Sequence, residues 1–117
     1  MNDPSLPGQV SYLICYRYSD EERKAALEFV LRRLATQLPE LEIVLIEQDA
    51  ASRLEDHHIP AGVKTVFVYN DGLFNRSWAF NVGVRRSERP LLVFGDADMF
   101  LSREDYLQCF AACRAFE

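Results

Sequence analysis

Two aspartates separated by a single residue, Asp96 and Asp98, have the type and spacing that metal chemistry needs. They follow the apolar run Pro90–Phe94 and Gly95, which predicts a buried strand. Carboxylates at positions i and i+2 of an extended segment point the same way, so both can face one divalent cation. Such a cation would neutralise a diphosphate and stabilise it as a leaving group. With eight aspartates in 117 residues, the number of such pairs expected by chance is about one half. A solvated turn that caps the next helix is therefore the alternative interpretation.

Two arginines also follow predicted strands. Arg17 comes directly after Val10–Tyr16, and Arg76 follows Val63–Tyr69 and the turn residues 70–72. A guanidinium group can bind phosphate oxygens through two parallel hydrogen bonds. A surface salt bridge is the alternative for each arginine.

The other side chains that could do chemistry are assigned to packing or to the surface. We expect Trp78 and Phe80 to lie in the core, and the pair His57-His58 to lie in an exposed loop rather than to bind a metal. Cys109 and Cys113, four residues apart, are expected on the core-facing side of the last helix. The sequence shows no arrangement typical of a serine or cysteine nucleophile, no phosphate-binding glycine loop and no GxGxxG motif.

The segments that must position these residues alternate between strand-like and helix-like patterns. Short apolar runs predict strands at Val10–Tyr16, Leu41–Ile46, Val63–Tyr69 and from Pro90 to Phe94. Helices are predicted from the N-caps Ser19 and Asp20 to Pro39, over Leu73–Ser87 and after Ser102, and the polar stretch Glu47–Gly62 is expected to be a loop that could contain a short helix. The first helix is expected to bury Ala26, Phe29, Val30, Leu34 and Leu38, and the last one Tyr106, Leu107, Phe110 and Cys113.

This order of elements, with mostly apolar rather than alternating strands, predicts an α/β fold. We expect an open, mostly parallel, Rossmann-like sheet of about four strands with helices on both faces. Ligands of such sheets bind beyond the carboxyl ends of the strands, near a switch in strand order. The residues that follow the strands are therefore the candidates for a site.

Composition limits the classes of function. The chain has 117 residues and a formal net charge of −5, which fits one domain and argues against nucleic-acid binding through a basic surface. We expect residues 1–9 to be a flexible N-terminus and residues 10–117 to form the domain. Three cysteines without a secretory signal favour reduced thiols and a cytoplasmic location, and no apolar run is long enough to be a transmembrane segment.

Two blocks of residues resemble the donor-binding half of GT-A glycosyltransferases. These are Phe74-Asn75-Arg76 with Asn81-Val82-Gly83, and then the apolar strand that ends in Asp96-Ala97-Asp98. The likeness is closest to the β-1,4-galactosyltransferase type and to related bacterial enzymes of the family 2 kind, which carry an FNRxxxxNVG block before a strand ending in DxD. It reaches back to Tyr16-Arg17 and to Ile46-Glu47-Gln48, and so covers most of Val10–Phe110.

The resemblance implies a nucleotide-sugar donor, usually a UDP-sugar, bound with Mn²⁺ or Mg²⁺. It also implies roles for individual residues. The residues that would contact the nucleotide are Tyr16, Arg17, Phe74 and Arg76, and Glu47 would contact its base or ribose. Asp96 would contact the ribose or donor sugar, Asp98 and Asp96 would bind the metal, and Asn81 and Gly83 would hold their helix against the sheet. The expected strand order places the fourth strand beside the first and so brings Arg17 and Asp98 together.

The sequence also departs from the family pattern. The proline expected before Tyr16-Arg17 is replaced by Cys15, and the chain stops at Glu117, before the acceptor half with its catalytic base and a further metal-binding histidine. The interpretation is a glycosyltransferase, transferring a hexosyl group to a carbohydrate or glycoconjugate acceptor, that is represented by its donor-binding half. A non-catalytic nucleotide-sugar-binding module is the alternative, and a haloacid-dehalogenase-like phosphatase is a third, weaker one. The apolar last helix is interpreted as a partner surface, for example in a homodimer, or as a sign of truncation.

Overall fold

Four parallel strands form the sheet on which the other elements rest. In the computed structural model, which describes residues 4–115, the strand order is β3-β2-β1-β4, with β1 over Val10–Tyr16, β2 over Glu42–Asp49, β3 over Lys64–Tyr69 and β4 over Leu91–Gly95. Each neighbouring pair is parallel, and Tyr16 lies opposite Glu47 in the register of β1 and β2. The predicted Rossmann-like α/β fold is confirmed, including the position of β4 beside β1.

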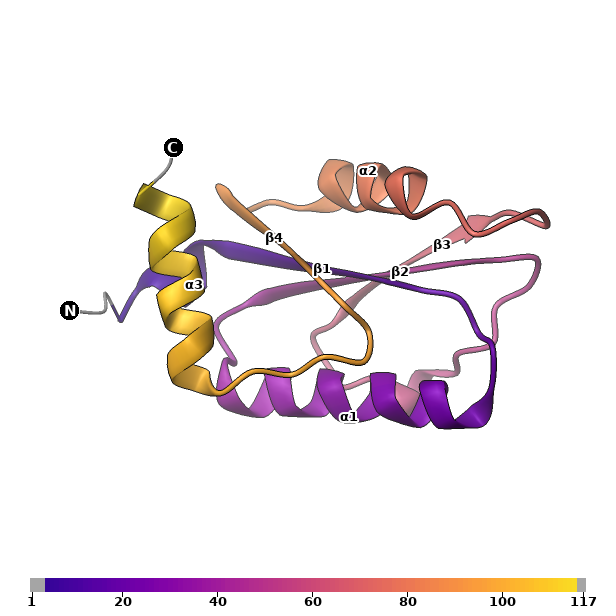
Figure 1. Cartoon of the computed structure of the whole chain (residues 1–117), viewed down its shortest axis with the longest axis horizontal. Helices are drawn as coiled ribbons and strands as arrows, with labels where there is room; N and C mark the ends of the chain where they lie inside the picture. The colour runs from indigo at the N-terminus through magenta and orange to yellow at the C-terminus, as the bar shows by residue number, and fades with distance from the viewer. Residues whose placement is uncertain (1–3, 116–117) are drawn as a thin grey trace.

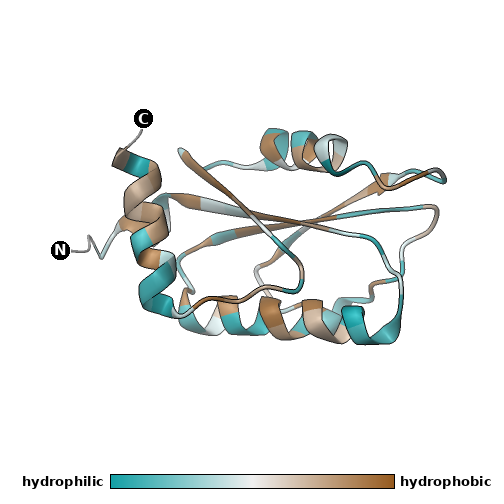
Figure 2. Ribbon diagram, viewed as in Figure 1, coloured by the Kyte–Doolittle hydropathy of each residue, from teal (hydrophilic) through white to brown (hydrophobic). Residues whose placement is uncertain are grey.

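Helices cover both faces of this sheet. Helix α1 (Glu21–Gln37) lies along one face, α2 (Arg76–Arg86) lies on the other, and α3 (Arg103–Ala115) crosses one end of the molecule (Figure 1). Residues of β1 alternate between the two cores: Tyr12, Ile14 and Tyr16 face the larger core on the α1 side, and Leu13 faces the smaller core under α2. In Figure 2, apolar segments alternate with polar ones along α1, as expected for a helix with one buried face.

Helix α1 begins at the predicted cap. The side chain of Asp20 accepts a hydrogen bond from the backbone N–H of Arg23 at 2.8 Å, and Glu21 and Glu22 lie in the first turn. Its buried residues are Leu27, Val30, Leu31 and Leu34, with Leu38 at the C-cap. The prediction for Phe29 is wrong, because the buried face includes Leu27 and Leu31 instead and leaves Phe29 57% exposed.

Helix α2 packs unusually close to the sheet at Gly83. A Cβ atom there would approach Ile46 Cδ1 to 2.6 Å and Leu13 Cδ2 to 2.8 Å, which confirms that Gly83 holds the helix against the strands. Asn81 is exposed, so the same prediction is wrong for it. Trp78 is 43% exposed on the outer side of the helix, so its prediction as a core residue is also wrong, while Phe80 is half-buried against Phe94.

Helix α3 is buried along a narrow stripe only. Tyr106 and Phe110 are buried as predicted, whereas Cys109 and Cys113 are exposed, so their prediction as core-facing residues is wrong. The physical reason is that α3 lies at the end of the sheet and packs mainly against β4 and the 3₁₀ turn η1 (Leu6–Gln9), rather than across a broad face. Phe116, part of the apolar end noted in the sequence, lies outside the described residues.

Two short turns complete the chain. In η1, Leu6 is 1% exposed and belongs to the core, so this part of the predicted flexible N-terminus packs on the domain. The long loop after β2 contains the turn η2 (Asp56–His58), in which the ring of His57 is largely exposed but that of His58 is mostly buried beside Glu28. Over residues 4–115, the helices are too short or too polar to cross a membrane.

Candidate functional site

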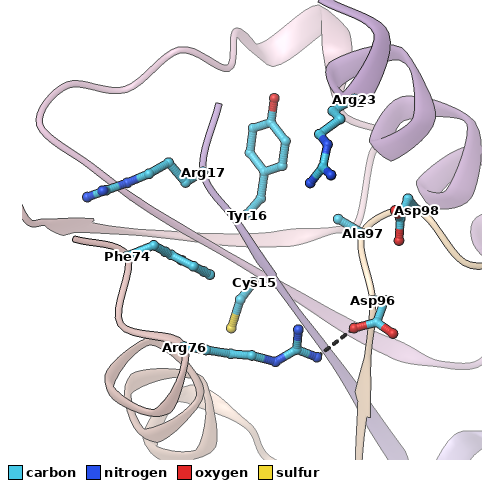
Figure 3. A pocket seen from close by; sticks show the side chains of 9 residues that line it. All are labelled: Cys15, Tyr16, Arg17, Arg23, Phe74, Arg76, Asp96, Ala97 and Asp98. Atoms are coloured by element: carbon cyan, nitrogen blue, oxygen red, sulfur yellow. Dashed lines mark hydrogen bonds and ion pairs between the residues drawn. The ribbon is translucent and has the colours of Figure 1, made fainter. Parts of the chain in front are cut away.

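A pocket of about 190 Å³ opens between the carboxyl ends of β1 and β4. It lies where the strand order switches, because α1 leads from β1 to β2 on one side while β4 pairs with β1 on the other. The lining residues come from four separate segments (Figure 3): Cys15, Tyr16 and Arg17 after β1, Arg23 of α1, Phe74 and Arg76 around the start of α2, and Asp96, Ala97 and Asp98 after β4.

Six residues that the sequence pointed to meet in this pocket. Arg17 and Asp98 both line the pocket, as predicted, because β1 and β4 are neighbouring strands. Phe74 and Arg76 are brought to it by α2, whose N-cap Asn75 accepts a hydrogen bond from the backbone N–H of Trp78 at 2.9 Å. Tyr16 and Asp96 complete the set.

Asp96 is engaged by Arg76. The guanidinium Nη2 of Arg76 donates to Asp96 Oδ1 at 2.6 Å, and both side chains are partly exposed. The Arg76 guanidinium also lies 5.1 Å from the centre of the Phe80 ring. This pair leaves little net charge on that side of the pocket.

Asp98 lies on a different side, because the segment after β4 is a turn. The backbone N–H of Met99 approaches the carbonyl oxygen of Asp96 at 3.5 Å, and Asp96 faces Arg76 while Asp98 lies near Arg23 (Figure 3). The expectation of an extended segment with two parallel carboxylates is therefore wrong.

The side chains that line the pocket limit which metal ions it could bind. Among residues 4–115 there is no group of three or more His, Cys, Asp or Glu side chains that could hold a metal ion. Magnesium-type cations are held by one or two carboxylates together with substrate phosphates; Asp98 is available for such a contact, whereas Asp96 would first have to leave Arg76. The residues therefore fit Mn²⁺ or Mg²⁺ only when a phosphate-bearing ligand supplies further oxygens.

Arg17 has much of its hydrogen-bonding capacity committed to the protein. It donates through Nε to the carbonyl of Gln48 at 3.0 Å, through Nη2 to that of Asn70 at 2.6 Å, and through Nη1 to that of Gly72 at 2.5 Å. A guanidinium has five N–H donors, so these contacts use a large share of them. Arg17 thus fastens the turn after β3 to the ends of β1 and β2.

Gln48 is a supporting residue that the sequence analysis missed. Its side chain is fully buried; Oε1 accepts from the backbone N–H of Asn75 at 2.7 Å and from Asn70 Nδ2 at 3.0 Å, and Nε2 donates to the carbonyl of Asn75 at 3.1 Å. These bonds fix the segment that carries Phe74. The only sequence signal was a polar residue at the end of an otherwise apolar strand.

The structure does not bring Glu47 to the pocket. Successive residues of a strand point to opposite faces, so Gln48 faces α2 and Glu47 faces the α1 side. There Glu47 is 5% exposed and accepts hydrogen bonds from Ser52 Oγ at 2.6 Å and from the backbone N–H of Arg53 at 2.7 Å. It lines a separate hollow beside β2 and β3.

Two neutral side chains lie along β1 at the pocket. Burial raises the pKa of the Cys15 thiol to about 12, although the nearby Arg76 charge acts to lower it. Burial raises the pKa of Tyr16 to about 12 as well, and its hydroxyl has no hydrogen-bond partner among the described residues. Both groups are therefore protonated at neutral pH, and Cys15 is not an activated nucleophile.

Arg23 is the other residue that the sequence analysis missed. The rule that ligands bind beyond strand ends points only to residues that follow strands, whereas Arg23 lies in the first turn of α1. It lines this pocket and also an adjoining hollow of about 330 Å³ that it shares with Asp98.

No family model, curated protein or solved structure matches this chain.

Proposed function

We propose that this chain binds a nucleotide sugar in the pocket between β1 and β4, as the donor-binding part of a GT-A glycosyltransferase. One observation carries the proposal. The two sequence blocks that resemble this family lie apart along the chain, with Asp96 20 positions after Arg76, and both blocks contribute side chains to the same pocket at the strand-order switch.

The two sides of the pocket suit the two ends of such a ligand. Phe74 is 38% exposed and offers an aromatic face to a nucleobase, and the hydrogen bonds of Gln48 to the neighbouring Asn75 keep its segment in place. Asp98 and the Arg76–Asp96 pair lie toward the other end, where a diphosphate and its cation would be held.

A divalent cation, Mn²⁺ or Mg²⁺, would be held by Asp98 and Asp96 together with phosphate oxygens. When bound, it supplies charge neutralisation for the departing diphosphate. Asp96 is paired with Arg76, so binding of the cation–nucleotide complex would exchange this pair for contacts with the ligand. Arg76 then becomes available to phosphate oxygens.

Glycosyl transfer would make a bond from the sugar C1 to an acceptor hydroxyl as the bond from C1 to the diphosphate breaks. The proton of the hydroxyl must pass to a base. None of the residues that line the pocket is suited to this role, because Asp96 is paired with Arg76 and Asp98 is assigned to the cation. This observation favours the second candidate function, a nucleotide-sugar-binding module that does not catalyse transfer alone.

Titration with UDP by calorimetry, with and without Mn²⁺, tests the proposal. We expect one UDP per chain, bound much more tightly with Mn²⁺ than without it. ADP and GDP are the matched controls for the base. Failure to bind millimolar UDP in the presence of Mn²⁺ would contradict the proposal. Release of UDP from a UDP-sugar with formation of a glycosylated acceptor would eliminate the non-catalytic alternative.

A further inference from the structure

The three arginines of the pocket differ in how far their side chains are already engaged. Arg17 donates to three backbone carbonyls, and Arg76 is paired with Asp96. The Arg23 guanidinium has no ion pair or hydrogen bond with any of the residues 4–115, whereas its backbone N–H donates to the Asp20 side chain at the start of the helix. An anion that enters the pocket therefore meets a free guanidinium only at Arg23.

The start of α1 explains why Arg23 reaches the pocket. Helix α1 begins five residues after the last residue of β1, so its first turn lies at the same rim as the strand end. Helical side chains tilt toward the N-terminus of their helix, which directs Arg23 back to this rim. In Figure 3 the Arg23 guanidinium lies on the side of Asp98, across the pocket from Phe74.

Arg23 and Asp98 line the same two hollows, the second of which Asp20 and Glu22 also line, but Arg23 and Asp98 do not form an ion pair. A guanidinium and a carboxylate that share a hollow without pairing are complementary to a phosphate with its cation. The guanidinium can donate two hydrogen bonds to phosphate oxygens, and the carboxylate can bind the cation. Within residues 4–115, neither side chain has a partner that it would have to give up.

We propose that Arg23 binds the terminal phosphate of the nucleoside diphosphate held in this pocket. The inference rests on the proposed function, and it adds a phosphate-binding residue that the family resemblance does not assign. Phe74 lies at the far side of the pocket, so the phosphate that is more distant from the base is the one that reaches Arg23. Arg23 therefore distinguishes a nucleoside diphosphate from a monophosphate.

Calorimetry with UDP and UMP in the presence of Mn²⁺ tests this assignment on Arg23→Ala and Arg23→Lys. Arg32→Ala is the matched control, since Arg32 is exposed on the same helix and lines none of the hollows near the pocket. We expect Arg23→Ala to weaken UDP binding about tenfold, as for the loss of a charged hydrogen-bonded contact. UMP binding should change less than about twofold, and Arg23→Lys should lie between the wild type and Arg23→Ala.

Equal effects of Arg23→Ala and Arg32→Ala on UDP would overturn the assignment, as would an equal loss of UDP and UMP binding in Arg23→Ala. Inorganic pyrophosphate with Mn²⁺ separates this proposal from the proposed function. If the wild type binds pyrophosphate in an Arg23-dependent way but prefers neither UDP nor any other nucleotide, the nucleotide function fails and the anion site at Arg23 stands. A wild type that binds neither pyrophosphate nor UDP would contradict both.

Discussion

The charged side chains at the two ends of the sheet differ in how far protein groups engage them. At the amino ends of the strands, Glu42 accepts hydrogen bonds from Ser11 Oγ at 2.6 Å, from the backbone N–H of Glu88 at 2.8 Å and from Lys64 Nζ at 3.2 Å. Arg89 likewise donates to backbone carbonyls on either side. Each of these charges is matched by protein groups.

At the carboxyl ends, the charges are divided between support and the pocket. Arg17 donates to the backbone carbonyls of Gln48, Asn70 and Gly72, and the buried amide of Gln48 is bonded to the backbone of Asn75. Arg23 and Asp98, by contrast, have no ion-pair partner in the described part of the chain. A charge that protein groups engage on all sides therefore stabilises the fold, whereas an unpaired charge beside a hollow is available to a ligand.

Glu42→Ala should have the largest effect on stability. It removes a largely buried carboxylate and leaves the hydroxyl of Ser11 and the amide of Glu88 without their acceptor, so we expect the free energy of unfolding to fall by about 3 kcal/mol. Urea denaturation measures this change. Glu88→Ala is the control: its side chain is 77% exposed and pairs with Lys64 at 3.5 Å, and it should cost less than about 0.5 kcal/mol.

The contribution of Glu42 should also depend on pH. Burial alone would raise its pKa, but hydrogen bonds from Ser11, the Glu88 amide and Lys64 outweigh burial and lower the pKa. The ionised carboxylate therefore stabilises the fold above the unfolded pKa of about 4.3, and this contribution is lost as the pH falls through the lower folded value. The stability difference between wild type and Glu42→Ala should narrow below about pH 4; a constant difference from pH 7 to pH 3 would contradict the role of the charge.

Gln48→Ala should cost about 2 kcal/mol of stability, because it removes a fully buried amide with its three hydrogen bonds to Asn70 and Asn75, and the backbone N–H of Asn75 loses its acceptor. Since this network also holds the segment of Phe74, UDP binding should weaken as well. Glu47→Gln, at the neighbouring buried position on the other face, serves as the control and should lower stability without changing UDP affinity. Equal losses of UDP affinity in the two variants would show that Gln48 has no special link to the pocket.

Trp78→Ala should cost only about 1 kcal/mol, because the indole is 43% exposed and only part of its apolar surface leaves water on folding. A fully buried tryptophan would cost about 3–5 kcal/mol. Thermal or urea unfolding separates the two values. A loss in the higher range would mean that α2 buries its outer face against something that covers Trp78 in solution.

The sequence predicted the sheet better than the helix faces. The apolar runs and their order are sufficient to predict the four strands. They also predict that Arg17 and Asp98 line one pocket, because strand order determines which carboxyl ends are neighbours. Helix faces are harder to predict: a period near 3.6 gives the spacing of buried residues but not how wide the buried stripe is. For this reason the spacing of Cys109 and Cys113 predicts core positions, although α3 packs on one narrow side and leaves both exposed.

The candidate site was predictable only in part, for a similar reason. Residues directly after strands could be found from the one-dimensional pattern, but Arg23 reaches the pocket through the geometry of a helix start. Gln48 rather than Glu47 supports the site because of strand alternation, which depends on the exact register. The turn at Asp96–Met99 separates the two aspartates, and no local pattern distinguished it from an extended segment.

Asp98→Asn should have the smallest effect on stability and the clearest effect on binding. Its carboxylate has no ion-pair partner among residues 4–115, so removal of the charge should change the free energy of unfolding by less than about 0.5 kcal/mol. If Asp98 binds the cation, Mn²⁺ should no longer strengthen UDP binding, while the weaker binding of UDP without metal is retained or slightly improved, since a negative charge near the phosphates is removed. Calorimetry with and without Mn²⁺ measures both quantities on one variant. A loss of several kcal/mol in stability with an unchanged effect of Mn²⁺ would place Asp98 with Glu42, among the charges that hold the fold together.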